Sequence, residues 1–151
     1  MTRYGPLESR DGHLAIGDLG GHHVRLTEAG IVILRHGEEP IQLGWNTIAS
    51  ATFDVRTTRF RWPGAVTTAL LAVAGAMLHD WEIVDQEYDA SFDVVPHEGD
   101  AVHVDVTRHH VGRYWVKPVR ATQALLRRLI DDPESRMLLR DPERLLAMLR
   151  A

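Results

Sequence analysis

The residues best suited to chemistry in this chain lie in a short segment that mixes cationic and aromatic side chains. It places Arg56, Arg59 and Arg61 beside Phe60 and Trp62. Guanidinium groups bind phosphate oxygens through paired hydrogen bonds, and aromatic rings favour the boundary between water and lipid. We therefore identify Arg56, Arg59, Arg61 and Trp62 as a candidate patch for anionic ligands, phospholipid headgroups above all. The alternative is an ordinary solvated loop.

Nine histidines raise the question of a metal site. The adjacent pairs His22–His23 and His109–His110 cannot chelate as units, because neighbouring strand residues point to opposite faces. His103 and Asp105 share one strand face and supply two ligands, whereas zinc needs three or four. We predict no metal site and interpret the histidines as surface residues.

No motif for nucleophilic or cofactor chemistry is present. The serines lack the surroundings of a nucleophile elbow, and the glycines at 17–21 lack the Lys-Ser/Thr of a phosphate loop. Alternation with apolar residues indicates that Asp89, Asp93 and Asp105 lie on the solvent-exposed face of a sheet. We predict no catalytic residue and no cofactor, and a metal-dependent enzyme is a distant alternative.

Composition limits the class of protein and its partners. At 151 residues, with 44% hydrophobic and 25% charged residues, the chain is typical of one globular domain. The net charge of −4 gives no general attraction to nucleic acid, so no such partner is expected. The chain has no cysteine, which excludes a disulfide scaffold and a thiolate site. Its first residues lack the apolar core of a signal peptide, so we expect a cytoplasmic protein. The use of arginine at every basic position but Lys117 indicates a bacterial genome rich in GC.

Alternating apolar residues, interrupted by Gly, Asp and Pro, predict an antiparallel meander of short strands. Such sheets bury one face and leave the other in water. The predicted strands span residues 22–27, 31–36, 40–44, 48–56, 87–95, 101–107 and 112–116.

An apolar helix is predicted between these strands, at residues 65–78. Val66, Leu70, Val73 and Met77 repeat at helical spacing, and many alanines favour helix over strand. A helix with so little charge must be covered. Its own sheet, a second subunit and lipid are the three possible covers, and the sequence leaves all three open.

The last third of the chain is predicted to be helical. A helix at 119–131 carries an apolar stripe, a further turn of helix covers 133–140, and a last helix spans 142–150. Asp141 is the expected N-cap of the last helix.

Two segments carry a family resemblance. L-T-E-A-G-I-V-I-L-R at 26–35, followed by I-Q-L-G-W-N-T-I at 41–48, resembles the opening of small bacterial pleckstrin-homology-like (PH-like) proteins. The resemblance implies a mainly β protein with α helices, in which a barrel of about seven antiparallel strands is followed by a helix. It divides the chain into an N-terminal arm at 1–21, with at most one short strand, a barrel with its helices at 22–131, and a helical extension at 132–151.

This resemblance also implies a type of function, because the family serves mostly in binding and scaffolding. We expect a non-enzymatic module that acts through protein–protein contacts, including self-association as a homodimer. The alternative is peripheral binding to an anionic membrane through the Arg56–Trp62 loop and helix 65–78.

The alternation and the helical stripe together predict one shared core. Its members should be Trp45, Ile48, Phe53, Val102, Val104 and Leu126.

Overall fold

The computed structural model describes residues 1–55, 57–58, 90–108 and 114–151. They form a mainly β protein with helices, as the sequence predicted, in two antiparallel sheets of six and three strands. A parallel pair, β8 (Thr57–Thr58) with β11 (Tyr114–Trp115), forms a third, small sheet. The described strands do not close into one continuous barrel.

The first sheet is a meander in sequence order, each strand antiparallel to the next. Its strands are β1 (Thr2–Tyr4), β2 (Leu7–Arg10), β3 (His13–Ile16), β4 (His23–Leu26), β5 (Gly30–Leu34) and β6 (Ile41–Gly44). The expected N-terminal arm with at most one short strand is therefore wrong, because β1, β2 and β3 belong to this sheet. These strands are interrupted by Gly5, Pro6 and Gly12, and β2 buries three residues in succession, so the segment shows no alternation in the sequence.

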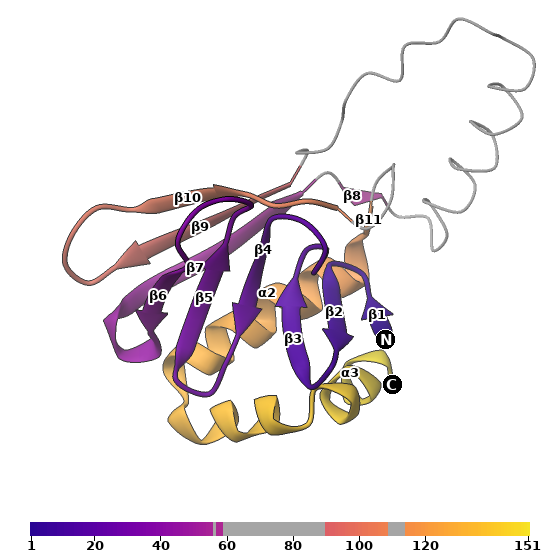
Figure 1. Cartoon of the computed structure of the whole chain (residues 1–151). Coiled ribbons are helices and arrows are strands. Elements are labelled where there is room, and N and C mark those ends of the chain that lie inside the picture. Colours follow the sequence, from indigo (N-terminus) through magenta and orange to yellow (C-terminus); the bar gives the residue numbers. More distant parts are fainter. Residues whose placement is uncertain (56, 59–89, 109–113) are drawn as a thin grey trace, which may run out of the picture.

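The second sheet has the order β10-β9-β7, with β7 (Ile48–Val55), β9 (Ala90–Pro96) and β10 (Val102–Asp105). Its strands run across those of the first sheet (Figure 1). The end of β10 is joined to the first sheet through Thr107, whose N–H donates to His22 O at 2.9 Å and whose carbonyl accepts from Asp18 N at 2.9 Å.

Helices complete the fold. They are α2 (Val116–Asp131), the 3-10 segment η2 (Pro133–Arg140) and α3 (Pro142–Arg150), with a short 3-10 turn, η1 (Trp45–Thr47), between the sheets. Asp141 is the N-cap of α3, as predicted, and its Oδ1 accepts from Arg144 N at 3.0 Å. Helix α3 packs beside β1, which brings the two ends of the chain together (Figure 1).

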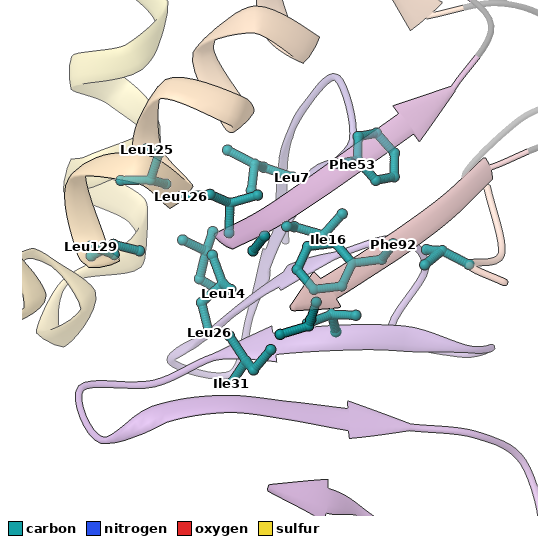
Figure 2. Packing of buried hydrophobic residues seen from close by; sticks show 14 of the residues in the cluster. Leu7, Leu14, Ile16, Leu26, Ile31, Phe53, Phe92, Leu125, Leu126 and Leu129 are labelled. Carbon is teal, nitrogen blue, oxygen red and sulfur yellow. The ribbon is translucent and has the colours of Figure 1, made fainter. Parts of the chain in front are cut away.

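One hydrophobic core lies between the sheets and α2. Figure 2 shows Leu125, Leu126 and Leu129 of α2 facing the leucines of the first sheet, with Phe53 and Phe92 beside them. The predicted core is confirmed: Trp45, Ile48, Phe53, Val104 and Leu126 are buried, and Val102 is partly buried against them.

The Leu-Thr-x-x-Gly-Ile motif has a clear structural basis. Trp45 donates its indole N–H to Thr27 O at 2.8 Å, and its backbone N–H to Ala29 O at 3.3 Å. A side chain at Gly30 would lie 2.0 Å from Leu43 O, so only glycine allows β5 and β6 to approach this closely. The motif thus anchors the β4–β5 turn to η1.

Three predictions concern residues outside the described ones. They are the helix expected at 65–78, the candidate patch at Arg56, Arg59, Arg61 and Trp62, and the histidine pair at 109–110. Within the described part of the chain, no helix has both the length and the apolar character needed to cross a membrane.

Candidate functional site

The outer face of the second sheet carries a histidine between two carboxylates. Register places His103 directly opposite Asp93, and Asp105 lies two residues along the same strand. His103 Nδ1 is 2.6 Å from Asp93 Oδ1, and Nε2 is 3.6 Å from Asp105 Oδ1. The sequence correctly placed His103 and Asp105 on one face, and strand pairing adds Asp93.

This arrangement favours a protonated imidazole. The hydrogen bond that His103 donates to Asp93, together with the charge of Asp93, raises the pKa of His103 above its ordinary value, and Asp105 adds a smaller effect of the same sign. Both ring nitrogens face carboxylates, which fix the orientation of the ring and stabilise its protonated form. Among the residues that the structure describes, no three His, Asp or Glu side chains are placed to share a metal ion.

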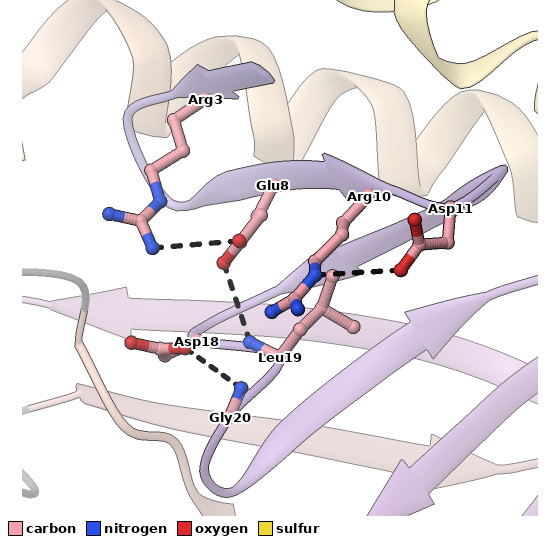
Figure 3. Close-up of polar contacts among 7 residues, drawn as sticks. All are labelled: Arg3, Glu8, Arg10, Asp11, Asp18, Leu19 and Gly20. Carbon is pink, nitrogen blue, oxygen red and sulfur yellow. Dashed lines mark hydrogen bonds and ion pairs between the residues drawn. The ribbon is translucent and has the colours of Figure 1, made fainter. Parts of the chain in front are cut away.

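A second polar cluster surrounds a buried carboxylate on the other sheet. Glu8 on β2 is 1% exposed, accepts from Leu19 N at 3.4 Å and pairs with Arg3 Nη2 at 3.5 Å (Figure 3). Asp18, in the same loop as Leu19, accepts from Gly20 N at 2.8 Å. Because a buried charge is costly unless it is paired and hydrogen-bonded, these contacts fix the loop on the sheet.

His23 lies near this cluster and has a defined tautomer. Its Nδ1 is 2.8 Å from Gly21 O, which can only accept, so Nδ1 carries the proton. Burial lowers the pKa of His23 below its ordinary value, and Arg25 acts in the same direction, whereas Gly21 O, Asp18 and Glu8 oppose the shift. Its Nε2 is buried and has no hydrogen-bond partner among the described residues. This cluster was not predicted from the sequence, since it lies on strands that were expected to form an arm and on a loop beside them.

The third feature is a basic face on α2, which we define as Lys117, Arg120, Arg127 and Arg128. All four residues are exposed, and no hydrogen bond or ion pair joins their side chains to any described residue. At about 100° per residue they fall within one stripe of the helix, opposite the buried leucines. Other arginines are engaged, for example Arg140 with Glu28 at 2.8 Å.

Helix stability accounts for only half of the basic face. Lys117 and Arg120 lie near the start of α2, where the helix dipole disfavours cations and where no acidic residue is present in the first turn. Arg127 and Arg128 lie near the end of the helix, where cations are favourable. Only the apolar stripe of this helix was predicted, although the spacing of the four basic residues is visible in the sequence.

Comparison of the chain with protein-family models, with curated proteins and with solved structures found no match.

Proposed function

We propose that this chain is a PH-like, non-enzymatic binding module that acts through contacts with other proteins. The basic face of α2 is its contact surface. The observation that carries the proposal is the set of four exposed cations, Lys117, Arg120, Arg127 and Arg128, without partners in the described residues of a chain whose net charge is −4.

The order of the elements supports the PH-like part of the proposal. Four antiparallel strands, β3 to β6, precede the three of the second sheet, and α2 follows and packs on β7. This is the order that the family resemblance implies, with β1 and β2 as additions at the edge of the first sheet. Since a fold does not specify a ligand, the binding surface has to be argued from its own residues.

Charge gives the class of partner. Four cations spread over about 16 Å of helix present no carboxylate before Asp131, so they attract an acidic surface and repel a basic one. Exposed charges of this kind contribute more to the rate and specificity of association than to its strength. The expected contact is therefore reversible and sensitive to salt.

An anionic membrane is the second candidate partner. The same four cations would be attracted to acidic lipid headgroups, and the Arg56–Trp62 loop, with helix 65–78, is the surface that the sequence suggests for it. This alternative predicts flotation with phosphatidylserine vesicles, which falls steeply with salt and is lost in Arg59→Glu.

Chromatography on immobilised polyglutamate tests the protein-binding proposal with a defined probe. The wild-type chain should be retained at low salt despite its net negative charge, and Arg120→Glu/Arg127→Glu should elute at clearly lower salt. Arg10→Glu/Arg144→Glu is the matched control, because it changes the net charge equally at exposed arginines outside the basic face. Equal elution of the two variants would refute the assignment of α2.

A further inference from the structure

We infer that the partner of the basic face is a second copy of this chain, which presents the outer face of its second sheet. This inference rests on the proposed function, and it specifies the partner by charge complementarity. The acidic face is defined as Asp54, Asp93 and Asp105, which lie on β7, β9 and β10.

Strand register brings these carboxylates together. Asp54 pairs with Ser91, which pairs with Asp105, so two acids flank a serine in one row. The next row is Thr52, Asp93 and His103. The acid side chains are open to solvent: Asp93 is 45% exposed and Asp105 is 59% exposed.

No lysine or arginine lies among the outward positions of these three strands. Those positions hold small or acidic side chains, the exposed Val95 and one histidine. Arg35, at the margin, is already engaged, because its Nη1 pairs with Glu38 at 3.0 Å and its Nη2 donates to His103 O at 2.9 Å. Three carboxylates against the protonated His103 still leave the acidic face with an excess of negative charge.

The two faces also match in size and shape. The basic face extends about 16 Å along one helix. Three strands spaced by about 4.8 Å give a surface about 10 Å wide. Along the strands, the five residues from Ser50 to Asp54 give this surface a length of about 13 Å. A helix lying on the face of a sheet is a common layer arrangement in proteins. Ala124, at the centre of the basic face, allows close approach.

The contact joins two different surfaces of the same chain. A copy that docks through its α2 still offers its acidic face to a third copy, so the association is head-to-tail and leads to rings or chains. Because its charges are exposed, it should weaken steeply as ionic strength rises.

Sedimentation velocity of the full chain between 20 and 300 mM NaCl tests the inference, because the Debye length falls over this range from about 20 Å to about 6 Å. The wild type should show concentration-dependent growth in mass at low salt and become monomeric at high salt. Arg120→Glu/Arg127→Glu and Asp93→Lys/Asp105→Lys should each weaken self-association by about tenfold or more, since attraction becomes repulsion at two pairs. Circular dichroism and thermal melting establish that each variant is folded.

Mixing supplies the decisive comparison. Neither variant should associate with itself, but a mixture should associate, because the sheet variant keeps the basic face of α2 and the helix variant keeps the acidic face of the second sheet. Combining both reversals in one chain should restore part of the self-association, because the reversed positions on the two faces again carry opposite charges. The control Arg10→Glu/Arg144→Glu should behave as the wild type.

Two results would overturn the inference. One is a wild type that stays monomeric at every salt concentration, and the other is unchanged association in Asp93→Lys/Asp105→Lys. A monomeric chain that is still retained on polyglutamate through α2 would leave the proposed function standing and refute only the second copy as its partner. A chain that neither associates nor binds polyglutamate would refute both.

Discussion

The side-chain amide of Gln123 completes the edge of the second sheet by pairing with the backbone around Phe53. Gln123 Oε1 accepts from Phe53 N at 3.0 Å, and its Nε2 donates to Ala51 O at 2.7 Å. One amide thus occupies the place of a neighbouring strand along β7. Because unpaired edge groups invite pairing with other chains, this contact both attaches α2 and protects the edge.

Replacing Gln123 should therefore destabilise the protein more than its surface position suggests. Gln123→Ala leaves Ala51 O and Phe53 N without their partner, and we expect a loss of about 1–3 kcal/mol in the free energy of unfolding. Urea denaturation measures it. Gln42→Ala, at an exposed position of β6, is the control and should change the stability by less than about 0.5 kcal/mol. Equal effects would refute the role of Gln123.

Truncation of Leu126 tests the packing of α2 on the core. Leu126 is fully buried, so Leu126→Ala should cost about 2–5 kcal/mol through lost burial and a residual cavity. Val95→Ala, at a residue 44% exposed, should have little effect. A Leu126→Ala chain as stable as the wild type would mean that α2 does not pack as described.

Adding a methyl group at Gly30 tests the close approach of β5 and β6. The new Cβ would lie 2.0 Å from Leu43 O, so the strands must separate or the turn must shift. We expect Gly30→Ala to destabilise by about 1–3 kcal/mol, as overpacking does. The control is Ala29→Gly, a change of the same size in the same turn. Gly99→Ala would not serve, because Gly99 has a φ of 94° that strains any other residue. The thermal melting temperature measures the effects of Gly30→Ala and Ala29→Gly.

Acidification should destabilise the fold through His23. Its folded pKa lies below the unfolded value of about 6.5, so the unfolded chain binds the proton more readily. The contribution of neutral His23 to the free energy of unfolding is complete above about pH 6.5. It falls as the pH decreases from there toward the lowered pKa of His23. His23→Gln should lose this part of the pH dependence in urea titrations, whereas His13→Gln, at an exposed residue, should keep it.

His103 should have the opposite dependence. Its folded pKa is raised, chiefly by the hydrogen bond to Asp93, so its contribution is complete below about pH 6.5 and is lost as pH rises through the raised value. NMR titration of the ring should show this elevated pKa in the wild type and a clear decrease in Asp93→Asn. Asp105→Asn should lower it less. An ordinary pKa in the wild type would contradict the geometry.

Sequence alone predicted the elements whose side chains repeat with a clear period. The alternation in β7, β9 and β10 and the stripe on α2 follow from burial of one face, and both were confirmed with shifts at the ends. The N-cap of α3 was also predictable, because capping by Asp141 depends only on neighbouring backbone.

Tertiary structure decided what depends on residues far apart in the chain. The role of Gln123 could not be predicted, because a polar helical residue looks the same whether it faces water or the edge of a strand. The burial of Glu8 likewise depends on the loop at Leu19 and on Arg3. Register alone set Asp93 against His103.

The basic face shows both contributions. Sequence determined that Lys117, Arg120, Arg127 and Arg128 share one side of a helix, since the helical period fixes that. Only the fold decided that this side faces solvent and that no described residue pairs with them, because a local pattern carries no information on which distant carboxylates come within reach.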